Sequence, residues 1–303
     1  LRVLPERMRE SLLRGLLGCD VVAFHTQRFV RNFLFCAHEL LGLPVDLDRG
    51  TVQIGDRTVW ARHYPISIDV EAVEKLAASD EVALHRAQID ERHLDGEDKQ
   101  LVVRIDRTDP SKNVLRGFRA FDLALEQHPE LVERVTFLAS LMPSRTDVPE
   151  YADYLSAIGG LVAEINAKYS TNGWQPIDLR LQEDLAFAVA SYELADVLVV
   201  NSVNDGMNLV AKEAMIANKR DGVLVLSENA GVHEELGRFA VTVHPFDVQQ
   251  QADAIFEALT MDREKRRSLL ENAAAIVRHN DVERWLERQL HDLAVVTERV
   301  SSR

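Results

Sequence analysis

Cysteine and positive charge are both scarce in this sequence. Only Cys19 and Cys36 occur in 303 residues. Two widely spaced thiols supply neither a zinc cluster nor a disulfide framework, so a reducing cytoplasmic location is expected. Thirty-five Lys and Arg face 49 Asp and Glu, which gives a net charge of −14. This balance argues against nucleic acid as a partner, and any anion must be bound by a few local cations.

Long apolar runs and several catalytic signatures are also missing. No apolar run approaches the roughly 18 to 20 residues of a membrane span, so no membrane partner is expected. The motifs GxSxG, GxxxxGK[ST] and GxGxxG do not occur, which excludes the usual hydrolase elbow, the Walker site and the dinucleotide fingerprint. The ten histidines show no HExxH and no ligand spacing with Cys or carboxylates, so we expect no metal site.

Apolar segments of strand length alternate with amphipathic segments of helix length. This pattern is typical of an α/β fold with a parallel sheet and crossover helices. The expected strands are 21–25, 101–105, 135–140, 197–201 and 223–227, and the expected helices include 28–41, 113–125 and 208–216. Segment 51–61 differs, because two alternating runs flank Gly55 and Asp56, and it predicts an antiparallel hairpin.

The same pattern divides the chain into three parts. Segment 70–99 is charged, has little strand character and predicts bridging helices. We therefore expect a remnant of an N-terminal, acceptor-side lobe over 1–69 and a complete doubly wound domain over 70–280. A C-terminal helix over 281–303 is expected to cross back to the first lobe. Because residues 1–69 hold too few strands for a sheet of their own and the chain starts with Leu1, truncation or processing is expected.

Two cations follow the strand 101–105 directly. Arg107 and Lys112 lie five residues apart, just before a predicted helix. Open α/β sheets place their ligands at the carboxyl ends of strands. Arg offers a planar fork and Lys a point charge to phosphate oxygens, and the helix N-terminus adds a favourable field. The motif thus predicts a diphosphate site. The alternative is a solvated loop in which Asp109 caps the helix.

A second motif, 204–215, follows the strand 197–201 and opens another helix. Gly206 permits a tight turn with the backbone close to a ligand, and Asn208 is a good N-cap. The amides around Leu209 and Val210 then become donors for an anion.

Two carboxylates frame this motif. Asp205 precedes the helix and Glu213 lies eight residues later, inside it. They predict two acceptors for hydroxyl groups at opposite ends of one ligand, with a sugar at Asp205, a ribose at Glu213 and a diphosphate on the amides between. The alternative is a turn with an ordinary N-cap and an exposed Glu213. Arg145 follows the strand 135–140, and its spacing fits an anion ligand and a surface arginine equally well.

At these residues the chain resembles the trehalose-6-phosphate synthases. These are retaining glycosyltransferases of the GT-B type, with two Rossmann-like lobes that face a cleft. The resemblance also includes LLRGLLGCD at 12–20, FHT at 24–26, VRNFL at 30–34, PISID at 65–69, SR at 144–145 and GVLVLS at 222–227.

The resemblance implies transfer of glucose, with retention, from UDP-glucose to glucose 6-phosphate, without a cofactor or an obligatory metal. It implies these roles: Arg107 and Lys112 bind the donor diphosphate; Asp205, Gly206, Met207 and Asn208 face the transferred glucose; Leu209 and Val210 donate amides; Glu213 holds the ribose; Arg145 binds the acceptor phosphate. Arg107, Lys112 and Asp205 are the implied catalytic residues.

Three departures from the family pattern keep alternatives open. The glycine-rich donor loop and the acceptor residues of the family precede the segment where this chain starts. Pro110 and Asn113 replace a Tyr and a Gly, and Glu183 stands where an aromatic residue is expected. One alternative is a pseudo-glycosyltransferase or a glucosylglycerol-phosphate-type synthase with a GDP- or ADP-linked donor. Another is a non-catalytic nucleotide-sugar-binding subunit that docks on a complete synthase. A homo-oligomer is a further possibility, and the isolated fragment is expected to be inactive.

Overall fold

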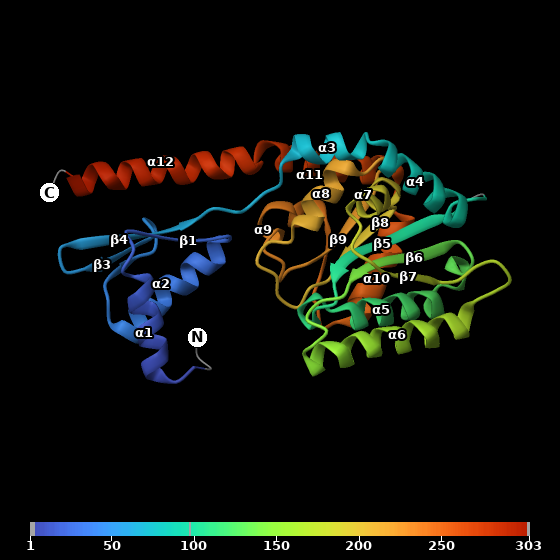
Figure 1. Cartoon of the computed structure of the whole chain (residues 1–303), viewed down its shortest axis with the longest axis horizontal. Helices are drawn as coiled ribbons and strands as arrows, with labels where there is room; N and C mark the ends of the chain where they lie inside the picture. Colours follow the sequence, from blue (N-terminus) through green and yellow to red (C-terminus); the bar gives the residue numbers. More distant parts are fainter. Residues whose placement is uncertain (1–3, 97, 302–303) are drawn as a thin grey trace. The chain divides into compact units, whose positions relative to one another are not determined.

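The computed structural model describes residues 4–96 and 98–301 (Figure 1). The chain forms two units. Unit 1 comprises Leu1–Ile66 and Val282–Arg303, and unit 2 comprises Ser67–Asp281.

Unit 1 is built on a four-stranded sheet with the order β1-β4-β3-β2, so the expectation that residues 1–69 hold too few strands for a sheet of their own is wrong. The two-residue strand 45–46 was too short to be seen as a strand in the sequence. The strands are β1 (Val21–Phe24), β2 (Val45–Asp46), β3 (Thr51–Ile54) and β4 (Arg57–His63), and the helices are α1 (Glu6–Leu16), α2 (Gln27–Leu41) and α12 (Val282–Ser301). β3 and β4 form the predicted antiparallel hairpin. Gly55 in its turn has a φ of +55°, a conformation that glycine adopts without steric cost. The tyrosine hydroxyl of Tyr64 donates to Asp292 at 2.7 Å and so ties α12 to the end of β4.

Unit 2 contains a six-stranded parallel sheet with the order β10-β9-β8-β5-β6-β7. Its strands are β5 (Gln100–Arg107), β6 (Val135–Met142), β7 (Ile177–Leu181), β8 (Val197–Val200), β9 (Val223–Ser227) and β10 (Val241–Val243). The chain builds outward from β5 through β6 to β7, then returns to the other side of β5 and builds β8, β9 and β10. The strand order therefore reverses between β5 and β8, and ligands of open α/β sheets bind at such a point.

Helices cover both faces of this sheet (Figure 1). They are α3 (Val70–Ala77), α4 (Asp80–His93), α5 (Val114–Gln127), α6 (Pro149–Tyr169), α7 (Leu185–Leu194), α8 (Leu209–Ala217), α9 (His233–Leu236), α10 (Val248–Thr260) and α11 (Arg263–His279). Helices α5, α6 and α10 pack together on one face, and α3, α4, α7 and α8 on the other. Along the part of the chain that the structure describes, no helix is both long and apolar enough to cross a bilayer.

The core of unit 2 lies between the sheet and these helices. Phe118 and Phe121 on α5 meet Phe137 on β6 edge to face, with ring centroids 5.3 and 5.2 Å apart. Both phenylalanine side chains of α5 are fully buried, as expected for the inward face of the amphipathic helix predicted over 113–125.

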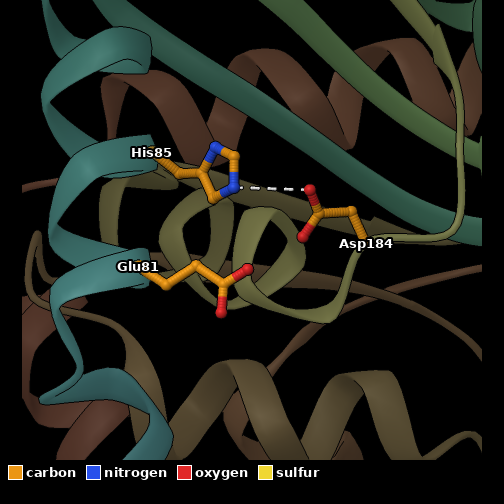
Figure 2. A group of neighbouring side chains, drawn as sticks. All are labelled: Glu81, His85 and Asp184. Carbon is orange, nitrogen blue, oxygen red and sulfur yellow. Dashed lines mark ion pairs between the residues drawn. The ribbon is translucent and has the colours of Figure 1, made fainter.

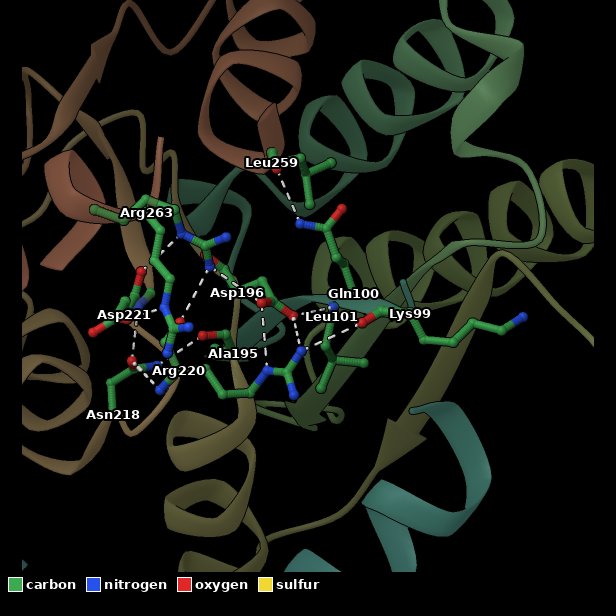
Figure 3. A network of polar contacts seen from close by, with 12 residues as sticks. Lys99, Gln100, Leu101, Ala195, Asp196, Asn218, Arg220, Asp221, Leu259 and Arg263 are labelled. Carbon is green, nitrogen blue, oxygen red and sulfur yellow. Dashed lines mark hydrogen bonds and ion pairs between the residues drawn. The ribbon is translucent and has the colours of Figure 1, made fainter. Parts of the chain in front are cut away.

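A network of charged side chains closes the amino edge of the sheet. The buried carboxylate of Asp196, just before β8, accepts from the Leu101 amide at 2.9 Å and forms ion pairs with Arg220 and Arg266. Figure 3 shows Arg220 reaching Asp196 from one side, and Arg263 beside Asp221. This network ties α11 to the strand starts. The carboxyl edge, at the opposite ends of the same strands, is where β5 and β8 deliver the two predicted motifs.

Candidate functional site

A pocket of about 410 Å³ opens at the carboxyl edge of unit 2. We call it the carboxyl-edge pocket. Its lining comes from the ends of β5 and β6, from the loop before α7 and from helices α7 and α8. The residues are Ile105, Asp106, Arg107, Lys112, Ser140, Met142, Gln182, Glu183, Asp184, Leu185, Ala188, Tyr192, Val210 and Glu213. Its size is within the usual range for small-molecule sites.

The ammonium group of Lys112 lies between two carboxylates. Its Nζ is 2.7 Å from Asp205 Oδ2 and 3.3 Å from Asp106 Oδ1. Burial lowers the pKa of Lys112, but the two carboxylates more than offset this, so the pKa lies above its ordinary value. Lys112 therefore stays charged at neutral pH, as a phosphate ligand requires.

Asp205 is fixed from several sides. Burial raises the pKa of Asp205, but Lys112, Asn208 and Ser202 outweigh it, and the net pKa is lowered. Asn208 donates to Asp205 at 3.1 Å, and its Oδ1 accepts from the Ala211 amide at 3.0 Å. The predicted N-cap is thus confirmed, and the same side chain connects the helix start to the carboxylate.

The loop 205–208 packs closely on the segment 230–232. Gly231 donates to the Asp205 carbonyl and Val232 to the Met207 carbonyl, at 3.1 and 2.8 Å. A Cβ on Gly231 would lie 2.1 Å from the Gly206 carbonyl oxygen, so only glycine fits there. The side chains of Met207 and Asn208 are buried, while Gly206 is exposed. Of the four residues expected to face a sugar, Asp205 and Gly206 are the accessible ones.

Glu213 lies in α8 and lines the carboxyl-edge pocket. Its Oε2 accepts from the Tyr192 hydroxyl at 3.3 Å. Burial raises the pKa of Glu213, and the Tyr192 bond opposes part of that rise. The alternative of an exposed Glu213 is therefore wrong, because the side chain is partly buried beside α7.

The two predicted arginines differ in their surroundings. Arg107 lines the pocket and pairs with Asp109 at 3.0 Å while its side chain stays 53% exposed. Asp109 stands at the N-cap of the short 3-10 helix Pro110–Lys112, but within the described residues its side chain accepts no capping hydrogen bond there and is buried. The alternative of a solvated loop capped by Asp109 is therefore wrong. Arg145 has a φ of +50° and donates to the Tyr151 hydroxyl at 2.9 Å. Among the residues that the structure describes, it is outside the set that lines the pocket.

The pocket also contains residues that the sequence analysis missed. Asp106 directly precedes Arg107, and this adjacency at a strand end was a usable signal. Tyr192 had no such signal in the sequence, because it lies in α7, a helix buried on nearly every side. Its hydroxyl reaches Glu213 only through tertiary packing.

Glu81, His85 and Asp184 form a further group (Figure 2). Their ligand atoms all lie within 4.8 Å of one another, and His85 Nε2 is 3.3 Å from Asp184 Oδ2. Glu81 and His85 are one helical turn apart on α4, a carboxylate–histidine spacing at odds with the expected absence of ligand spacing. Glu81 is exposed, and Asp184 already caps α7 through the Phe187 amide at 2.8 Å. The group alone defines no metal site, and the expectation of no metal stays a prediction.

Comparison with known proteins identifies the family of this chain. The model of glycosyltransferase family 20 matches residues 1–295. The chain is 36% identical over 298 residues to a UDP-forming α,α-trehalose-phosphate synthase of Pichia angusta, covering 97% of this chain and 61% of that protein. A synthase of Schizosaccharomyces pombe is 38% identical over 274 residues, or 89% of this chain and 52% of that protein. The chain thus spans about half to three fifths of these relatives.

Solved structures of similar proteins lead to the same family. A trehalose-6-phosphate enzyme of E. coli bound with UDP-2-fluoro glucose has a TM-score of 0.87 and 29% identity, covering 96% of this chain and 64% of that one. A Burkholderia xenovorans synthase in complex with glucose-6-phosphate has a TM-score of 0.87 and 28% identity, covering 96% and 65%. The predicted GT-B type α/β fold and the predicted resemblance are confirmed. Since the family model spans nearly the whole sequence, the chain belongs to glycosyltransferase family 20.

Proposed function

We propose that this chain carries the donor-binding domain of a retaining glycosyltransferase. The enzyme would transfer glucose from UDP-glucose to glucose 6-phosphate and produce trehalose 6-phosphate. The observation that carries the proposal is the carboxyl-edge pocket, where Arg107 and Lys112 face Glu213 at the strand-order reversal of the sheet. The relatives that the chain matches are synthases of this type.

The cations and the α8 helix start would bind the donor diphosphate. Lys112 would exchange one of its carboxylate bonds for a phosphate oxygen, and Arg107, half exposed, would add a second contact. Leu209 and Val210 are the first residues of α8, and their amides would donate to the same phosphates. A helix N-terminus favours such an anion.

The carboxylates would position the two sugars of the donor. Glu213 would accept from ribose hydroxyls, while Asp205 and Gly206 would lie beside the glucose. Arg145 would bind the phosphate of the acceptor. In the transfer, the bond between glucose C1 and the phosphate oxygen breaks and a bond from C1 to the acceptor oxygen forms on the same face. The acceptor hydroxyl proton passes to the leaving phosphate. Fixed cations and amides stabilise the charge that develops there.

The domain roles follow from this proposal. Residues 70–280 would form the donor side, and residues 1–69 with the helix over 281–303 would belong to the acceptor-side lobe. No cofactor is required, because the chemistry needs only the leaving diphosphate, the acceptor hydroxyl and electrostatic stabilisation.

Calorimetric titration with UDP tests the proposal. Lys112→Met should weaken UDP binding by about 10- to 100-fold, because a charge-assisted bond to phosphate contributes about 1.5 to 3 kcal/mol. Lys265→Met is the matched control, since Lys265 is exposed on α11 and pairs only loosely with Glu257 at 3.8 Å. Equal UDP affinity in both variants would reject the assigned site.

A GDP-linked donor is a second candidate, and the lining residue Glu183 favours it. A carboxylate accepts from the ring N–H and the exocyclic amino group of guanine, whereas uracil offers it a single N–H. Titration with GDP and with UDP separates the two donors. A GDP preference that Glu183→Ala abolishes would favour the second candidate.

A further inference from the structure

Arg104 is an arginine in the middle of the unit 2 sheet. It belongs to β5, between β6 and β8, and its side chain is fully buried. Arginine is almost never fully buried unless it is paired, because its charge must leave water. The buried charge of Arg104 must therefore be stabilised by the groups around its guanidinium.

The guanidinium lies where the neighbouring strands separate. β5 and β8 pair at Val102 with Val197 and at Val103 with Leu198, the last paired positions before Arg104. Arg104 Nη1 then donates to Asn201 Oδ1 at 2.6 Å, just beyond the end of β8. The side chain connects the two strands at the point where they diverge to form the site.

The same guanidinium holds the segment that carries Lys112. Its Nη2 lies 2.9 Å from Asp106 Oδ2 and also donates to the backbone carbonyl of Lys112. Asp106 in turn contacts the Lys112 ammonium at 3.3 Å. Arg104 thus fixes Lys112 at both its backbone and its side-chain partner.

A glycine provides the room for this contact. A Cβ on Gly117, in α5, would lie 2.7 Å from Arg104 Nη1 and 3.2 Å from Asn201 Nδ2. Glycine inside a helix costs about 1 kcal/mol relative to alanine. Here it lets the helix approach the guanidinium and its asparagine partner.

Charge balance explains why a cation occupies this position. Asp106 and Asp205 both lie beside Lys112, and without Arg104 the two carboxylates would share one cation. With Arg104 the group holds two positive and two negative charges. Burial raises the pKa of Asp106 on balance, and the Arg104 guanidinium is the largest influence that opposes this rise.

We propose that Arg104 is a positioning residue of the donor site. By holding the Lys112 carbonyl and the Asp106 carboxylate, it sets the place of the ammonium group that meets the donor diphosphate. This inference rests on the proposed function for the identity of the ligand, while the placement of Lys112 can be tested without any ligand.

Gly117→Ala displaces the guanidinium without removing its charge. Gly159→Ala is the matched control, because Gly159 is also helical and a Cβ there meets nothing within 4 Å. We expect Gly117→Ala to weaken UDP binding about tenfold, the contribution of one charge-assisted hydrogen bond. Uridine binding, followed by NMR, should change by less than about twofold, since uridine carries no phosphate. Gly159→Ala should leave both affinities unchanged.

A double-mutant cycle tests whether Gly117 acts through Arg104. In an Arg104→Met background, Gly117→Ala should not weaken UDP binding relative to uridine binding any further, because the guanidinium that it would displace is already gone. An equal loss of UDP and uridine binding, no loss at all, or an undiminished loss in the Arg104→Met background would overturn the inference.

The ligand-free readout is the NMR titration of the Lys112 side chain. Since Asp106 and Asp205 raise the pKa of Lys112, displacement from them in Gly117→Ala should lower its titration midpoint, with no change in Gly159→Ala. An unchanged midpoint overturns the inference. If the wild type binds neither UDP nor GDP while the midpoint still falls, the proposed function fails and the positioning role stands.

Discussion

Replacing Lys112 should destabilise unit 2 in a pH-dependent way. Lys112→Met leaves the carboxylates of Asp205 and Asp106 without their shared cation. Breaking a buried ion pair costs about 3 to 5 kcal/mol. Arg104 still pairs with Asp106 and Asn208 still donates to Asp205. We therefore expect the lower end, a loss of about 3 kcal/mol in the free energy of unfolding at pH 7.

The sign of the pH dependence follows from Asp205. The native pKa of Asp205 is lowered in the wild type. Its ionised side chain therefore adds to the free energy of unfolding above the unfolded pKa, and this stabilisation is lost as the pH falls through the native pKa. Without Lys112 the pKa of Asp205 rises, so Asp205 is protonated at a higher pH than in the wild type and its isolated charge is removed as the pH falls. The loss in the free energy of unfolding of Lys112→Met should then fall to about 1 kcal/mol.

Urea unfolding followed by circular dichroism at pH 7 and pH 4 measures both values. Lys265→Met is again the control and should change stability by less than about 0.5 kcal/mol at either pH, as expected for an exposed pair. A loss of stability in Lys112→Met that is equal at both pH values, or larger at pH 4, would show that Lys112 does not stabilise the ionised carboxylates.

Substitutions at three other residues have defined outcomes. Asp196→Asn removes the charge on which two arginines converge, and urea unfolding should show a loss of about 3 kcal/mol; a UDP affinity altered more than about twofold in the folded variant would contradict a purely structural role. Asn208→Ala loses the helix cap and must hold a φ of +79°, so it should cost about 2 kcal/mol, and Asn208→Gly less than about 1 kcal/mol; equal losses would argue against this account of the cap. Tyr192→Phe removes a bond that lowers the pKa of Glu213, so UDP affinity, measured by calorimetry at several pH values, should decline from a higher pH as the medium is acidified; an unchanged profile would exclude that coupling.

The sequence predicted the elements that carry strong local signals. The strand before Asp205 is a continuous apolar run, and the strand that ends at Arg107 is an apolar run interrupted by Arg104. Each is followed by Gly, Asn or charged residues that start a helix. Because parallel strands end at the same edge, these two motifs had to meet. The structure places Lys112 2.7 Å from Asp205, although 93 residues separate them.

Other features left no local pattern. β7 was missed because Asp178 and Arg180 interrupt a short edge strand, and β10 because it has only three residues. Arg104 could not be distinguished from an ordinary polar residue in an apolar run, since its partner Asn201 lies 97 positions later. Tyr192 is likewise defined by packing. Residues whose role depends on a distant partner escape analysis by periodicity.

A crystal structure of the UDP complex shows directly whether Lys112 and Arg107 bind the donor phosphates. We expect a phosphate oxygen within hydrogen-bond distance of Lys112 Nζ, with the distance from Nζ to Asp205 longer than the 2.7 Å found here. UDP bound with its phosphates away from Arg107 and Lys112, or bound outside the carboxyl-edge pocket, would contradict it.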